Sequence, residues 1–114
     1  MAFGISRGEL ERWKQQVKEG RIAFLTHYWI DSRFPGITSV TKVGCSDLTK
    51  LRKWAISHGL PPQYIHNREQ FPHYDIFGET QIRILRKERQ WDQLYRFVIK
   101  KKDDQAATGP TLRP

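Results

Sequence analysis

Cysteine is almost absent from this sequence, since Cys45 is the single one among 114 residues. A lone cysteine cannot form a disulfide within the chain, which excludes a disulfide-stabilised scaffold and favours a reducing compartment. Long apolar runs are also missing: the longest, residues 22–30, contains a threonine and a histidine and is shorter than the ~20 residues of a transmembrane helix. Residues 1–7 lack the basic-then-apolar order of a secretory signal. We therefore expect a cytoplasmic protein with no membrane partner.

Apolar residues are few as well, at 38% of the chain, against the roughly 45–50% of an ordinary globular domain. Four Trp, six Phe and four Tyr residues compensate, because each aromatic side chain can bury about 150–250 Å². The length suits one domain. We expect a small, aromatic-rich domain over residues 1–102, followed by a disordered tail over residues 103–114, which has little to bury.

Capping residues delimit two helices in the first half of the chain. Ser6 and Glu9 have the spacing of a capping box, and Gly20 can supply the left-handed residue that ends the first helix. The Ser-Asp pair at 46–47 can cap a second helix, which Gly59 ends. These signals predict helices before Gly20 and before Gly59.

The remaining segments predict strands and further helix. Residues 21–30 are rich in aromatic and branched side chains, as in a buried strand, and residues 37–43 alternate like a more exposed one. Residues 61–78 indicate an ordered loop with one short strand at most. The helical pattern of residues 79–101 leaves open whether it forms one helix or two. Together they predict a small single-domain α/β fold, with a mixed sheet flanked by three to four helices.

Basic residues outnumber acidic ones by 20 to 12, which gives a net charge of +8 and a pI near 9.9. The excess is largest between residues 83 and 102, which hold eight basic and two acidic residues. A basic helix face is typical of proteins that bind nucleic acid or another polyanion, although Lys and Arg also favour any solvated helix. The candidate phosphate-binding residues are Arg52, Lys53, Arg83, Arg86, Lys87, Arg89, Arg96 and Lys100.

Aromatic and basic residues also alternate at 29–34 and at 50–54. Exposed rings beside guanidinium groups can stack unpaired bases, which would suit a single strand. Trp54, however, also falls next to the apolar stripe of its helix, so in the alternative its ring belongs to the core. No pair of helices has helix-turn-helix spacing, which favours RNA over DNA.

No strong catalytic or metal-binding motif is present: the sequence lacks a Gly-rich phosphate loop, paired cysteines and a nucleophilic Ser elbow. No cofactor and no metal is therefore assigned. Histidines in the 61–78 loop could approach an aspartate and share a proton or a metal ion with it, beside basic residues that hold a phosphate. In the alternative, Asp75 is only a turn acceptor. The candidate catalytic residues are His66, His73, Asp75 and Asp31.

Three short motifs in a fixed order carry a resemblance to a known family. Ser-Asp at 46–47, Gly-Leu-Pro at 59–61 and His-Tyr-Asp at 73–75 lie within residues 22–90, the part of the chain that is similar. In this order they resemble the YneQ-like proteins, a group of small bacterial and phage proteins of unknown function. The resemblance implies a common fold and no particular activity. It also implies a common site around Asp31, Asp47, His73 and Asp75.

Three functions remain open at this point. The first is a domain that binds nucleic acid, with RNA ahead of DNA, or that associates with nucleoprotein. The second is a small hydrolase that acts on a phosphate-bearing or nucleotide substrate through the His and Asp residues. The third is a protein-interaction module for an acidic partner. The sequence leaves substrate, sequence specificity and oligomeric state open.

Overall fold

The computed structural model describes residues 4–67 and 71–99 and confirms a small α/β domain. Lys100 and the predicted tail at 103–114 lie outside the described residues. None of the helices within the described part is long and apolar enough to cross a membrane. The elements, in chain order, are α1 (Arg7–Lys18), β1 (Ala23–Tyr28), β2 (Ser39–Gly44), α2 (Leu48–Ser57), the 3₁₀ turn η1 (Pro62–Tyr64), β3 (His73–Ile76), α3 (Gly78–Lys87), α4 (Trp91–Gln93) and the π-helical segment η2 (Leu94–Val98).

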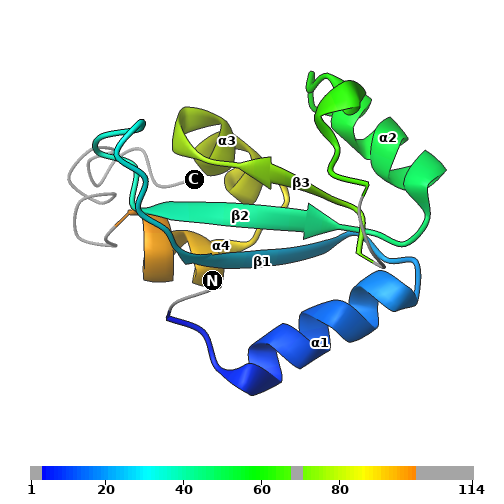
Figure 1. The fold of residues 1–114 in the computed structure, drawn as a ribbon, viewed down its shortest axis with the longest axis horizontal. Coiled ribbons are helices and arrows are strands. Elements are labelled where there is room, and N and C mark those ends of the chain that lie inside the picture. Colours follow the sequence, from blue (N-terminus) through cyan, green and yellow to red (C-terminus); the bar gives the residue numbers. More distant parts are fainter. Residues whose placement is uncertain (1–3, 68–70, 100–114) are drawn as a thin grey trace, which may run out of the picture.

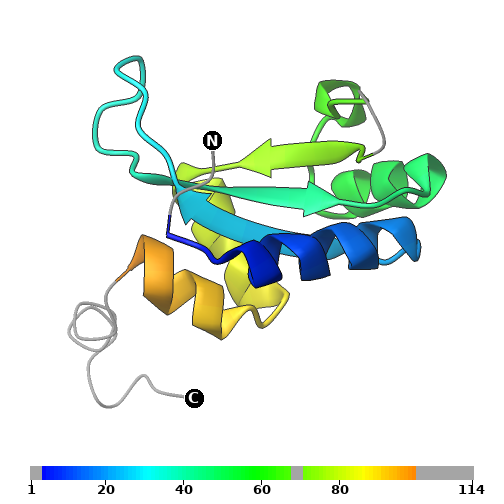
Figure 2. The same ribbon diagram turned by 60° about the horizontal axis from the view of Figure 1, so that its bottom comes forward.

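The three strands form one sheet in the order β1-β2-β3 (Figure 1). Both pairs of strands are antiparallel, with Leu25 opposite Lys42 and Lys42 opposite Asp75. The parallel pair that a mixed sheet would add is therefore absent from the described residues. The hairpin loop of residues 29–38 extends past the sheet at the end away from α2 (Figure 2).

Alternation along the strands gives the sheet two different faces. The packed face, which includes Phe24, Thr41 and Tyr74, is covered by α2, α3 and the α4–η2 segment. We call the opposite face the α1 face; it presents Leu25, His27, Lys42, His73 and Asp75. Helix α1 packs on this face over β1 and the end of β2, mainly through Trp13 and Val17, which contact Ala23, Leu25 and Gly44. The rest of the α1 face, toward β3, is therefore free to form a site.

The predicted caps are confirmed, because they depend on neighbouring residues alone. Ser6 and Glu9 form both hydrogen bonds of the capping box, at 2.7 and 3.1 Å. Asp47 accepts a hydrogen bond from the first turn of α2. Gly20 and Gly59 follow their helices with φ values of 80° and 73°, the left-handed conformation that favours glycine.

The structure of the second half of the chain answers two questions that the sequence left open: whether residues 79–101 form one helix or two, and whether Asp75 lies in a turn. The described part of this range, residues 79–99, holds two helical segments, because α3 ends at Lys87 and Arg89 takes a left-handed φ of 58° before α4 begins. His73-Tyr74-Asp75 lies in strand β3, so the alternative that placed Asp75 in a turn is wrong. The triplet pairs with β2 because Tyr74 and Ile76 alternate toward the packed face and are buried there.

A chain of buried hydrogen bonds crosses the packed face and ties the helices to the sheet. The Gln81 side-chain amide of α3 donates to Thr41 Oγ1 at 2.9 Å, and Thr41 Oγ1 lies 2.6 Å from Thr26 Oγ1. Thr26 Oγ1 donates to the Gln93 side-chain carbonyl at 2.6 Å, and Gln93 Nε2 donates to the Phe24 carbonyl at 3.0 Å. Each atom named in this chain thus has a hydrogen-bond partner within the protein.

The outer edge of β1 is occupied by side chains. The Trp29 backbone N–H bonds to the β2 side of the hairpin, so odd-numbered residues of β1 bond to β2 and even-numbered carbonyls point outward. Among these, the Phe24 carbonyl accepts from Gln93 Nε2, and the Tyr28 carbonyl accepts from His27 Nδ1 at 2.9 Å.

Arg96 joins the end of the chain to the start of α1, and this contact predicts an acid-sensitive stability. Its guanidinium contacts the Glu9 carboxylate and donates to the Gly4 carbonyl at 2.6 Å. The hydrogen bonds from Arg96 and then from Ser6 lower the pKa of Glu9 from 4.5 to about 2.

Because the folded-state pKa of Glu9 is depressed, its contribution to stability is present above pH 4.5 and is lost as the pH falls toward 2. We expect Glu9→Gln to melt at a lower temperature than wild type at pH 7, and the gap to narrow at pH 3. Thermal melts of both proteins at the two pH values measure this. A gap that stays constant between pH 7 and pH 3 contradicts it.

Candidate functional site

A pocket of about 590 Å³ lies over the free part of the α1 face. Strand residues form its floor, and Leu10 and Trp13 of α1 stand on one side of it. The aromatic rings of Trp29, Phe71 and Phe77 complete its lining. The polar residues that line it are Lys14, His27, Lys42, His66, His73 and Asp75.

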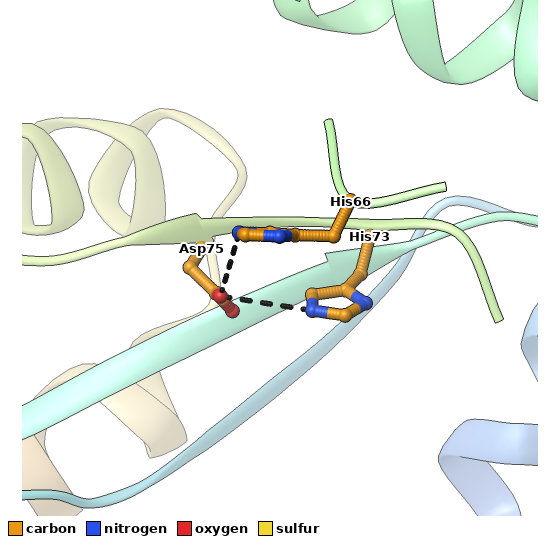
Figure 3. Close-up of side chains that lie close together, drawn as sticks. All are labelled: His66, His73 and Asp75. Atoms are coloured by element: carbon orange, nitrogen blue, oxygen red, sulfur yellow. Dashed lines mark ion pairs between the residues drawn. The ribbon is translucent and has the colours of Figure 1, made fainter. Parts of the chain in front are cut away.

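Three of the four predicted catalytic residues meet in this pocket: His66, His73 and Asp75 (Figure 3). His66 Nε2 lies 3.4 Å from Asp75 Oδ2, and His73 Nε2 lies 3.6 Å from the same oxygen. His73 and Asp75 share a face because they are two residues apart on β3. Residue 66 joins them through two backbone hydrogen bonds with residue 73, at 2.8 and 3.1 Å, which stack the two imidazole rings with centroids 5.0 Å apart.

The carboxyl of Asp75 is ionised although it is largely buried. Burial by itself would raise the pKa of Asp75, but the adjacent His73 and the charges of Lys42 and His66 outweigh it and lower the pKa. Lys42 is its direct neighbour across the sheet. Oδ1 is buried with no hydrogen-bond partner among the described residues, so only Oδ2 is shared by the imidazoles. Asp75 therefore gives the pocket a fixed negative charge.

The ring of His73 is held in one orientation. Its Nδ1 lies 3.0 Å from the Phe71 carbonyl oxygen, which can only accept, so Nδ1 carries the proton. In the neutral imidazole, Nε2 then carries a lone pair, and this nitrogen faces Asp75. His66 is freer, since 46% of its side chain is exposed.

Three further polar residues of the pocket, Lys14, His27 and Lys42, fall outside the predicted set. His27 is only 4% exposed, and burial lowers the pKa of its imidazole. Its Nδ1 donates to the Tyr28 carbonyl, and Nε2 is buried without a partner among the described residues. The signal in the sequence was the alternation along β1, which puts His27 on the same face as Leu25. Lys42 can be assigned to the pocket only after the pairing of β2 with β3 is known, because this pairing places Lys42 opposite Asp75.

Asp31 does not join the cluster. It lies in the hairpin loop beyond β1, where Arg33 Nε contacts both of its carboxylate oxygens, at 3.0 and 3.1 Å. These hydrogen bonds lower the pKa of Asp31 to about 2. The expectation placed Asp31 at a strand end near the loop histidines, but Asp31 lies three residues beyond the end of β1, within the hairpin loop, and does not line the pocket. Asp47, which the resemblance added to the common site, caps α2.

The predicted phosphate-binding residues are spread over several surfaces. Arg52 and Lys53 are exposed on α2, and Lys87 is exposed near the end of α3. Arg83 donates to the His58 carbonyl at 3.1 Å, and Arg96 is engaged by Glu9 and Gly4, as described above. Arg86 is half-buried, Arg89 is exposed between α3 and α4, and Lys100 lies outside the described residues.

Aromatic and basic residues alternate in two segments, 29–34 and 50–54, and only the aromatic residues of the first are available to a ligand. Trp54 is 9% exposed, packs edge-on against Phe24, and donates its ring N–H to Glu88 at 3.0 Å. The prediction that Trp54 stacks on a base is therefore wrong, and its ring belongs to the core. Trp29 in contrast is half-buried and lines the pocket.

Comparison with known proteins identifies one close relative. The chain is 56% identical over 99 residues to a Bacillus subtilis (strain 168) protein described as uncharacterized protein YneQ, an alignment that covers 87% of this chain and all of the relative. No protein-family model matches the chain, and no solved structure matches it significantly. The resemblance carried by the three sequence motifs is thus confirmed over most of the chain, which belongs to the YneQ family.

Proposed function

We propose that this protein binds single-stranded nucleic acid, RNA ahead of DNA, and that the pocket on the α1 face holds one nucleotide of the strand. The observation that carries the proposal is the composition of the pocket, where aromatic rings and basic side chains line the same space. Proteins that bind single strands combine these two features, since rings stack on bases and cations neutralise phosphates. A volume of about 590 Å³ suits a nucleotide, because small-molecule pockets span roughly 300–1,000 Å³.

The aromatic side of the pocket is a group of touching rings. Trp29 lies 5.9 Å from Phe34 and 5.6 Å from Phe77, measured between ring centroids, and Phe34 lies 5.0 Å from Phe77. All three are half-buried, so they keep their orientation and still present ring surface. A base that stacks there would not need to order a mobile side chain first.

Basic side chains outnumber acidic ones among the charged residues that line the pocket. Lys14 and Lys42 line it, against the single carboxylate of Asp75. Lys14 Nζ and Lys18 Nζ each lie 5.8 Å from the centre of the Phe71 ring. Phosphates on either side of a bound base would meet these lysines, and the exposed cations of α2 enlarge the positive field around the molecule.

The test is anisotropy of a labelled single-stranded oligonucleotide, as RNA and as DNA, across a salt series. Affinity should fall linearly on a log–log plot. The double variant Lys14→Glu/Lys42→Glu should weaken binding at least about 10-fold and flatten the slope by about 1.4, the loss of two phosphate contacts. The control is Arg7→Glu/Arg21→Glu, which makes the same change of charge at exposed positions that do not line the pocket.

Trp29→Ala separates stacking from charge in the same assay. It should weaken binding by about 5- to 100-fold without changing the salt slope, because one stacked base is worth about 1–3 kcal/mol. Trp91→Ala is the matched control, since Trp91 is 45% exposed and does not line the pocket. Equal losses in both lysine and arginine variants would show that net charge alone binds the strand. No binding of wild type at low salt would remove the proposal.

A second candidate, cleavage of the bound strand, is favoured by the position of His66, His73 and Asp75 in the same pocket. Two imidazoles beside a carboxylate can supply a general base and a general acid for phosphodiester hydrolysis. The incubations that measure binding also measure this, by denaturing gel. Products that accumulate with wild type and not with His73→Ala would support a hydrolase, whereas intact RNA would leave binding as the function.

A further inference from the structure

We propose that His66, His73 and Asp75 form a binding site for a divalent transition-metal ion such as Zn²⁺. The three residues also line the pocket proposed above for a nucleotide, but their donor atoms, from β3 and the backbone bridge beside it, are brought together by the fold itself, so metal binding can be tested without nucleic acid. Each residue offers one ligand atom, and these atoms all lie within 4.8 Å of one another. Figure 3 shows both imidazole rings directed at the Asp75 carboxylate.

The spacing of the donor atoms matches a shared ion. Ligands bound at about 2.1 Å in tetrahedral geometry lie about 3.4 Å apart. Asp75 Oδ2 lies 3.4 Å from His66 Nε2 and 3.6 Å from His73 Nε2. These separations are longer than an ordinary hydrogen bond between nitrogen and oxygen, which is about 2.9 Å. A metal ion could thus enter after small shifts of the side chains.

The hydrogen bonding of His73 leaves the correct atom available to a metal. Its Nδ1 donates to the Phe71 carbonyl at 3.0 Å, so the Nε2 lone pair of the neutral ring faces Asp75 Oδ2. Two acceptors that face each other repel, unless a proton or a cation lies between them. A backbone carbonyl that binds the second ring nitrogen is also the usual support for a metal-bound histidine, since it fixes the tautomer and the orientation of the ring.

The donor set defines the class of ion. Two imidazole nitrogens and one carboxylate oxygen suit Zn²⁺, Fe²⁺, Co²⁺ or Ni²⁺, whereas Mg²⁺ and Ca²⁺ prefer ligands that are all oxygen. Three protein ligands leave at least one coordination position for water or a substrate. Here that position is accessible, because His66 is 46% exposed and all three residues line the pocket. The positive charge of Lys42, across from Asp75, limits the affinity.

The experiment is calorimetric titration of Zn²⁺ into the chelator-treated full-length chain, with no nucleic acid present. We expect one ion per chain and no binding of Mg²⁺. His73→Ala and Asp75→Asn should each weaken Zn²⁺ binding by more than about 100-fold. Loss of a residue that only hydrogen-bonds to a metal ligand costs about 10- to 100-fold, so a larger loss identifies a direct ligand. Asp31→Asn and His58→Gln are the controls and should keep the wild-type affinity, since both residues lie outside the cluster.

Circular dichroism establishes that each variant is folded, and His66→Gln, at a largely exposed position, tests the site if the other variants unfold. Co²⁺ gives a second signal: bound to wild type it should show the visible absorption of a low-coordinate complex, and His66→Gln should abolish it. Absence of Zn²⁺ binding at about 100 µM, or equal binding by wild type and the folded ligand variants, would overturn the site. Either outcome leaves nucleic-acid binding to be judged on its own titrations.

Discussion

Replacing Gly44 with valine is expected to lower the free energy of unfolding by about 3 kcal/mol, the upper end of the cost of overpacking. Gly44 ends β2 directly beneath α1. A Cβ added there would lie 2.6 Å from Trp13 Cζ2 and 2.9 Å from Val17 Cγ2. Neither side chain can retreat easily, because both are buried. Valine adds two more methyl groups, so α1 must move away from the sheet.

Urea denaturation of wild type and variant measures this effect. Gly20→Ala is the control, since Gly20 has open space around it and its φ of 80° adds only the backbone strain of a left-handed residue, about 1–2 kcal/mol. Trp13→Leu should relieve part of the clash, so Gly44→Val should cost less in that background than in wild type. Additive losses in the double variant would show that α1 is not held against Gly44.

Thr41→Val is expected to cost about 2 kcal/mol, because it removes the middle of the hydrogen-bond chain on the packed face and leaves a buried amide unsatisfied. Gln81 is 1% exposed, and its remaining side-chain contact, to Ser39 Oγ, is a weak 3.4 Å. The valine side chain has nearly the same shape, so the loss comes from hydrogen bonding and not from a cavity.

Two comparisons test this cause. Thr49→Val makes the same change at an exposed position of α2 and should stay within about 0.5 kcal/mol of wild type. Thr41→Val combined with Gln81→Leu should recover part of the loss, since no polar group is then stranded. If the double variant is as unstable as the sum of its parts, the buried amide is not the source.

Features that depend on a few adjacent residues could be predicted from the sequence. The capping box at Ser6 and the left-handed glycines at 20 and 59 are local, and each lies where its motif indicated. The meeting of His66 and His73 was partly predictable, because both lie in one short segment with prolines that restrict it. The grouping of aromatic and basic residues in the pocket was less predictable, since they come from α1, the strands and the loops between them.

What the sequence could not predict depends on strand pairing. Lys42 becomes a neighbour of Asp75 only after β2 and β3 are aligned in antiparallel register. The short strand allowed for residues 61–78 had no predicted position, and it lies at residues 73–76. The prediction that Asp31 is a catalytic residue was wrong for the reverse reason. Its position at the end of a strand indicated a site, but it lies in the hairpin loop, where Arg33 binds it. Trp54 had two interpretations, and its packing against Phe24 decides between them.

Sheets with unpaired edges are prone to aggregation, because a strand from another molecule can add to them. In β1, two of the three outward carbonyls are already engaged, by Gln93 from the last helical segment and by His27 from the strand itself. On the opposite edge, the backbone of His66 pairs with His73 and blocks the start of β3. A sheet of only three strands thus protects both edges with its own side chains and loops, which discourages amyloid-like growth.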